Sequence, residues 1–338
     1  MKNLFDYATK ELSQDAFLRW LFENYNCDNE SVKKACRKLF DSFTDNKFKD
    51  KTMTDLTTVV QWKNIDIAIW FKVDGIEQLI IIEDKTGSGI HNNQLARYEK
   101  EIIGHNDFWR KEENRQKYDV ERYIEKTGNV FKIFYKTNII DEWESKHAKE
   151  LSWKTYDIYS IYKLFKDIEP NNEVLSYYID YIKKIHSAAK REQPPSEWVG
   201  ISWHSFFNEY KNPKCISAKT EIGCYRKEYY YTKLFIKNHE NDMPCFEIRS
   251  RDFKFDKNSG EHSITVRAVL YNLTEQSNAE SIEAWQQSLK THGFSLNYRT
   301  DITKHKQIGT IQINFFEDNV QAITDVLDKT SMLLVEIF

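Results

Sequence analysis

The feature that most limits the fold of this chain is a pair of apolar segments separated by Asp74-Gly75. Residues 65–73 alternate isoleucines with other side chains, which is the period of a β-strand. Residues 79–82 are continuously apolar and indicate a second, buried strand. Asp-Gly is the strongest short signal for a two-residue hairpin turn. We therefore predict an antiparallel hairpin that pairs Val73 with Ile76 and Ile67 with Ile82.

The remaining patterns divide the chain into two predicted domains of different fold class. The stretch 190–196 contains two prolines in a polar run and is the best linker candidate. We predict an α/β domain over residues 1–192, with a mixed central sheet flanked by helices, and an α+β domain over 197–338. Helices are expected near 12–21, 31–43, 90–103, 158–166, 173–189, 281–290 and 320–334, and further strands near 130–135, 229–236, 245–255, 263–271 and 308–315.

Composition restricts the class of protein. The net charge is -3, which argues against a protein that coats nucleic acid regardless of sequence, although a local basic groove is compatible with it. The five cysteines are odd in number and none lies in a C-x-x-C motif, so we expect reduced thiols. The first residues carry no apolar core typical of a signal peptide, and no apolar run has the length of a membrane span. We therefore expect a cytoplasmic protein with no membrane partner.

The hairpin brings three charged side chains together at one end. Its register places Asp66 opposite Glu83, and two carboxylates in that position destabilise a sheet unless something compensates them. Lys85 follows Glu83 by two residues and projects from the same face, whereas Asp84 projects from the other. A divalent cation between the carboxylates, or a raised pKa on one of them, would each provide the compensation. A salt-bridge cluster at a strand end is the alternative.

This arrangement resembles the signature of the PD-(D/E)XK nuclease superfamily, in which Asp66 is followed on the next strand by Glu83-Asp84-Lys85. Ile65 stands where the proline of the motif's name would be. Downstream, Gln94 and Tyr98 match the Q-x-x-x-Y helix of the RecB-like branch, and their spacing places them on one helical face. Upstream, residues 11–17 resemble the first helix of an uncharacterised bacterial PD-(D/E)XK family.

The resemblance implies Mg²⁺- or Mn²⁺-dependent hydrolysis of phosphodiester bonds, in DNA rather than RNA. It implies that Asp66 and Glu83 bind the metal and that Lys85 assists the nucleophile. Gln94 and Tyr98 would support the site and contact nucleic acid. Glu11 is either a third metal ligand or a residue that favours the start of its helix. Lys63 either contacts phosphate or is simply solvated at a strand end.

Two other functions stay open at this point. One is a nucleic-acid-binding or scaffold protein that retains the fold but does not cut. The other is a protein that acts through interactions of the second domain, with the hairpin triad serving as a salt bridge. The sequence leaves open a homo-oligomer or an activating protein partner. The resemblance also indicates a bacterial or phage context, with a role in defence against foreign DNA.

Overall fold

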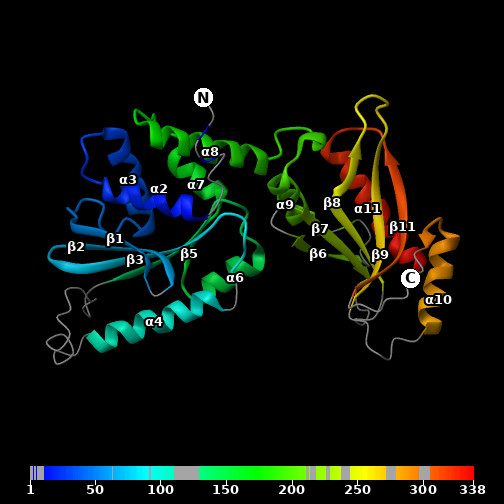
Figure 1. The fold of residues 1–338 in the computed structure, drawn as a ribbon, viewed down its shortest axis with the longest axis horizontal. Coiled ribbons are helices and arrows are strands. Elements are labelled where there is room, and N and C mark those ends of the chain that lie inside the picture. Colours follow the sequence, from blue (N-terminus) through cyan, green and yellow to red (C-terminus); the bar gives the residue numbers. More distant parts are fainter. Residues whose placement is uncertain are drawn as a thin grey trace. The chain divides into compact units, whose positions relative to one another are not determined.

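The computed structural model describes most of the chain, and it divides into two compact units. The described residues are 3, 5, 11–62, 64–90, 93–109, 129–210, 213, 218–225, 229–236, 244–271, 279–296 and 305–338. Unit 1 spans Met1–Ser187 and unit 2 spans Ala188–Phe338 (Figure 1). Each unit has its own sheet, and we describe them separately.

Unit 1 is built on a five-stranded sheet in the order β1-β2-β3-β4-β5. Strands β1, β2 and β3 pair antiparallel, and β3, β4 and β5 pair parallel, so the sheet is mixed. The prediction of a mixed sheet flanked by helices is confirmed. The elements in chain order are α2 (Glu11–Glu23), α3 (Glu30–Phe43), β1 (Thr54–Trp62), β2 (Ile65–Val73), β3 (Ile76–Lys85), α4 (Gln94–Trp109), β4 (Val130–Lys136), α6 (Glu142–Glu150), β5 (Lys154–Tyr156), α7 (Ile158–Phe165) and α8 (Glu173–Ala189).

Helices cover both faces of this sheet, as the figure shows for α2, α3, α7 and α8 on one side and α4 and α6 on the other (Figure 1). On the first face, Phe71 packs edge-on against Phe40 of α3. The second face forms a separate buried cluster in which Trp70 and Ile81 pack with Tyr98 of α4 and Ala148 of α6. Burial on both faces explains why β3 carries almost no exposed residue and reads as a continuous apolar run.

The central hairpin has the register that the turn residues predict. Val73 pairs with Ile76 and Ile67 pairs with Ile82. Asp74 and Gly75 both have positive φ, 54° and 79°, which is the geometry of a type I′ turn. Ile65, expected on the face of Ile67, instead belongs to the buried cluster on the α4 side, next to the tight turn from β1 into β2.

Three elements of unit 1 were not predicted from the sequence: β1, α6 and the three-residue strand β5. β1 is an edge strand in which only Thr58 is buried, so its side chains show no clear alternation of apolar and polar residues. α6 is nine residues long, and it buries only Glu144 and Ala148. Helix α4 also continues to Trp109, beyond the predicted end at residue 103.

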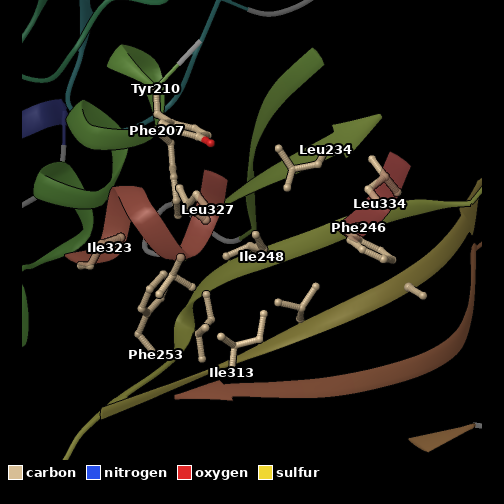
Figure 2. Packing of buried hydrophobic residues seen from close by; sticks show 14 of the residues in the cluster. Phe207, Tyr210, Leu234, Phe246, Ile248, Phe253, Ile313, Ile323, Leu327 and Leu334 are labelled. Carbon is tan, nitrogen blue, oxygen red and sulfur yellow. The ribbon is translucent and has the colours of Figure 1, made fainter. Parts of the chain in front are cut away.

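Unit 2 combines a six-stranded sheet with helices, and the expected α+β class is confirmed. The described neighbours in the sheet are all antiparallel, in the order β10-β11-β9-β8-β7-β6. Figure 2 shows Phe207 of α9 and Leu327 of α11 packed over Ile248 of the sheet. The elements are η1 (Pro195–Glu197), α9 (Gly200–Glu209), β6 (Ala218–Tyr225), β7 (Tyr229–Ile236), β8 (Cys245–Phe255), β9 (His262–Tyr271), α10 (Ala279–Thr291), β10 (Ser295–Leu296), β11 (His305–Phe315) and α11 (Val320–Ile337).

Within the ranges described above, none of the helices combines the length and the hydropathy that crossing a bilayer requires.

Candidate active site

The hairpin brings Asp66, Glu83 and Lys85 together on the α4 side of the unit 1 sheet. Asp66 is the second residue of β2, and Glu83 and Lys85 are near the end of β3. Continuing the ladder by one pair beyond Ile67–Ile82 puts Asp66 opposite Glu83. The parallel strand β4 adds Lys136 beside Lys85. The carboxyl end of β3 therefore concentrates charge on a face that is otherwise apolar.

Hydrogen bonds fix the orientation of these groups. Lys85 Nζ contacts the Glu83 carboxylate, lies 3.8 Å from Asp66 Oδ2 and donates to the backbone carbonyl of Asp84 at 3.1 Å. The backbone N–H of Asp84 donates to Asp66 Oδ2 at 2.8 Å. One lysine thus bridges both carboxylates, and the chain itself holds the Asp66 side chain.

Burial makes the two carboxylates unequal. Glu83 is fully buried, whereas 16% of the Asp66 side chain is exposed, so Asp66 forms the accessible edge of the group. Burial, followed by the nearby charge of Asp66, raises the pKa of Glu83 to about 8 even though Lys85 opposes the shift. The single lysine therefore does not compensate both acids when both are ionised, and either a bound proton or a cation would stabilise the pair.

Helix α4 supports this group through a chain of hydrogen bonds. The Gln94 side-chain amide donates to the Tyr98 hydroxyl at 2.6 Å, and that hydroxyl donates to the Asn64 carbonyl at 2.7 Å. Asn64 has a positive φ of 63° in the tight turn that leads into β2. The Tyr98 hydroxyl lies close to the acidic pair, and burial, followed by the charge of Glu83, raises its pKa to about 12. Gln94 and Tyr98 thus pin the turn that precedes Asp66.

A second acidic pair lies on the opposite face of β3, toward α2. The Asp84 carboxylate is completely buried and accepts a hydrogen bond from the Gln14 side chain. Burial and the adjacent carboxylate of Asp15 raise the pKa of Asp84 well above its usual range. The sequence places Asp84 away from Glu83, as observed. The sequence alone does not show that α2 carries Asp15 to the buried end of β3.

Further side chains near the group were not singled out from the sequence. Gln61 of β1 has a positive φ of 52° and reaches Asp66 Oδ1 through its amide at 3.3 Å. Lys136 donates to Glu144 of α6 at 2.7 Å, and both side chains are buried. Each contact joins two different elements, β1 with β2 and β4 with α6, so the spacing within a single strand or helix does not reveal it. The pairing of β1 with β2 would have identified Gln61, had β1 been recognised.

Two predicted site residues lie outside the part of the chain whose side chains are described. Glu11 begins helix α2, but its side chain belongs to the undescribed part, and Lys63 lies wholly outside it. Within the described residues, no three His, Cys, Asp or Glu side chains gather as they would around a metal ion. The described carboxylates that contact or face Lys85 in the candidate group are those of Asp66 and Glu83, and the proposed roles of Glu11 and Lys63 stay predictions.

Comparison with known proteins identifies the family of unit 1. The family model described as the PD-(D/E)XK nuclease superfamily matches residues 2–183. No curated protein and no solved structure matches the chain. The matched region contains the mixed sheet, the Asp66, Glu83 and Lys85 group, and the helix with Gln94 and Tyr98. The chain therefore belongs to the PD-(D/E)XK nuclease superfamily, as the resemblance predicted, and this membership implies a nuclease that acts on nucleic acid.

Proposed function

We propose that the protein hydrolyses phosphodiester bonds in DNA with the help of Mg²⁺ or Mn²⁺, at a centre formed by Asp66, Glu83 and Lys85. The observation that carries the proposal is the meeting of two carboxylates and one lysine at the ends of adjacent strands, inside the region that matches a nuclease superfamily. A salt bridge at a strand end would be solvated and of little value to the fold. This group is instead buried, and it carries two acids for one base.

The residues fit a divalent cation. Glu83 Oε2 is buried, and the Tyr98 hydroxyl close to it also donates its proton to the Asn64 carbonyl at 2.7 Å. Among the residues that the structure describes, Asp66 Oδ1 receives a single 3.3 Å contact, from the Gln61 amide. Mg²⁺ prefers oxygen ligands and commonly takes one or two carboxylates, with water and substrate phosphate as its other ligands. We assign Asp66 and Glu83 as metal ligands, together with the backbone carbonyl of Asp84.

When bound, a divalent cation in such a site lowers the pKa of water and stabilises negative charge at the reacting phosphorus. The chain's own groups have separate tasks. Asp66, held by the Asp84 N–H, presents an oxygen at the accessible edge. Lys85, which contacts Glu83 and lies 3.8 Å from Asp66, provides the positive charge that orients the nucleophile or neutralises the phosphate. Gln94 and Tyr98 keep the turn before Asp66 in place.

Activity on DNA rather than RNA, and a role in defence against foreign DNA, are the finer parts of this proposal. They are supported by the resemblance of residues 11–17 to an uncharacterised bacterial PD-(D/E)XK family and of the Q-x-x-x-Y helix to the RecB-like branch. The net charge of -3 favours binding of the substrate by residues around the active site over non-specific binding by the whole protein surface.

The proposal is tested by incubating the full chain with single- and double-stranded DNA and RNA in Mg²⁺, in Mn²⁺ and in EDTA. Asp66→Ala and Lys85→Ala are the test variants. Asp55→Ala and Lys72→Ala are matched controls, because these residues form a surface ion pair at 2.9 Å on β1 and β2, at the other end of the same hairpin region. Loss of a metal ligand or of a transition-state charge is expected to slow cleavage by roughly 10²- to 10³-fold or more.

The experiment has three informative outcomes. Metal-dependent cleavage that is lost in both test variants and retained in both controls supports the proposal, and the panel names the polymer. Metal binding without cleavage of any polymer favours a nucleic-acid-binding protein that kept the fold. Equal cleavage by all variants shows that the activity lies elsewhere and contradicts the proposal.

A further inference from the structure

A large aromatic side chain lies exposed at the periphery of the candidate active site. Trp143, in the first turn of α6, has 53% of its surface exposed. Most tryptophans are largely buried in the protein that carries them, and an exposed indole is a side chain typical of binding surfaces. What such a residue binds depends on what surrounds it.

Glu144, the next residue, anchors this turn to the active-site loop. Its buried carboxylate accepts hydrogen bonds from the Ile90 N–H at 3.2 Å, from Lys136 Nζ at 2.7 Å and from the Asp141 N–H at 2.9 Å. Ile90 belongs to the loop that leaves Lys85, and Lys136 pairs with Lys85 across the parallel strands. One carboxylate therefore ties α6 both to the loop and to β4.

Gly89 shows how closely the loop approaches the indole. A Cβ atom added to Gly89 would lie 3.1 Å from Glu144 Oε1 and 3.5 Å from Trp143 Cζ2. Gly89 follows Lys85 by four residues, so their Cα atoms lie at most about 14 Å apart. The indole thus lies beside the loop at Gly89, so near that an added Cβ atom would contact it, and within the length of a few nucleotides of the proposed cleavage centre. Figure 1 shows α6 beside the end of α4 that carries Gln94.

Basic groups accompany the indole on its helix. Lys146 and His147 follow Trp143 by three and four residues and share its helical face. Lys146 is exposed and His147 is half-buried. An aromatic ring beside exposed positive charge is the combination with which proteins hold single-stranded nucleic acid, the ring stacking on a base and the cation meeting the backbone.

We propose that Trp143 stacks on an unpaired base of the substrate, so that the preferred substrate has a single-stranded stretch beside the scissile phosphate. In a duplex the faces of internal bases are covered by their neighbours, so an indole fixed in this position has no base face to meet. This inference rests on the proposed function, because it names the substrate class of the same site.

The test measures binding by fluorescence anisotropy of a labelled single strand and of a blunt duplex of the same sequence, in Mg²⁺. All proteins carry Lys85→Ala so that the probe survives. Trp143→Ala, Trp143→Phe and the control Phe316→Ala are compared, since Phe316 is an aromatic residue of unit 2 that is 72% exposed. Thermal melting confirms that each variant is folded.

Stacking on one base contributes about 1–3 kcal/mol, so Trp143→Ala is expected to raise the Kd for the single strand roughly 5- to 150-fold. The Kd for the duplex and the behaviour of Phe316→Ala should change by less than about twofold. Trp143→Phe should recover most of the affinity, because it keeps an aromatic face. A series of single strands, each lacking one base at a different position, locates the stacked base. Trp143→Ala should leave the Kd unchanged only for the strand that lacks the base on which Trp143 stacks.

Unchanged single-strand binding in Trp143→Ala, or an equal loss for single strand and duplex, would overturn the inference, as would no binding of either probe. Failure of the proposed function has a different signature. If the wild-type chain cuts no polymer while single-strand binding still depends on Trp143, the stacking role stands and the nuclease assignment falls. If the wild-type chain cuts and Trp143 has no influence, the reverse holds.

Discussion

The two faces of β3 carry two acidic centres that differ in what neutralises them. On the α4 side, Glu83 contacts an ammonium group and faces Asp66, whose side chain reaches the surface. On the α2 side, Asp84 is enclosed and meets the amide of Gln14 and the carboxyl of Asp15. In the first centre two acids share one lysine and the Asp66 carboxylate is partly exposed to solvent. The side chains of the second centre are closed to solvent. Burial of acids alone therefore does not mark an active site; a charged partner and an accessible oxygen do.

The largest expected effect is the dependence of metal affinity on pH, which only the first centre should produce. Burial and Asp66 raise the pKa of Glu83 to about 8 from 4.5, so below pH 8 the metal-free protein holds a proton on a proposed ligand. Metal binding must then release it, and affinity should fall by up to about tenfold for each pH unit below 8. Calorimetric titration in buffers of different ionisation enthalpy counts the released proton.

The same shift has an opposite consequence for the stability of the metal-free fold. A carboxyl group whose pKa is raised in the folded state stabilises the fold fully below its unfolded pKa, and this contribution is lost as pH rises through the folded value. The free energy of unfolding without metal should therefore decrease between pH 4.5 and about 8, and Glu83→Gln should flatten that decrease. Equal slopes in wild type and Glu83→Gln would contradict the assignment of this pKa.

Substitutions at Asp84 address the second centre. Burial and Asp15 raise the pKa of Asp84, which favours its protonated form, and Asn has the same shape as a protonated Asp. Asp84→Asn should leave stability and cleavage nearly unchanged. Asp84→Ala leaves the buried Gln14 amide without its acceptor and should lower the free energy of unfolding by about 1–3 kcal/mol, measured by urea denaturation. A loss of cleavage in a stably folded Asp84→Asn variant would show that the second centre also takes part in cleavage, and would contradict the distinction between the two centres.

The smallest effect is expected from the support of the first centre by α4. Tyr98→Phe removes the hydrogen bond to the Asn64 carbonyl and leaves Gln94 without its acceptor. The free energy of unfolding should fall by about 1 kcal/mol. The cleavage rate should fall less than in Lys85→Ala, since the lost bond holds a turn rather than the reacting groups. Cleavage at the wild-type rate would show that pinning the turn does not matter to the site.

Much of the first centre was predictable because its residues belong to a regular hairpin. The Asp74-Gly75 turn determines the register, and the strand period then places Glu83 and Lys85 on one face. The four-residue spacing of Gln94 and Tyr98 likewise follows from helical geometry. These relations depend on local rules of backbone structure, so the sequence reveals them without knowledge of the tertiary fold.

The contacts that the sequence did not reveal depend on tertiary packing. Glu144 joins the loop at Ile90 to Lys136. Its helix is short and mostly charged, so the sequence shows no apolar residues at helical spacing that would predict it. Gln61 reaches Asp66 only because an edge strand with a positive φ pairs beside β2. Predicting the raised pKa of Asp84 likewise requires knowing that α2 covers it.

The most direct test of the account is calorimetric titration of Mn²⁺ and Mg²⁺ into the wild-type chain, Asp66→Ala and Asp84→Asn. The account predicts that wild type and Asp84→Asn bind the metal with similar affinity and that Asp66→Ala loses binding. Binding that survives in Asp66→Ala but is lost in Asp84→Asn would place the metal on the other face of β3. No binding in the wild-type chain would contradict a metal-dependent centre at Asp66 and Glu83.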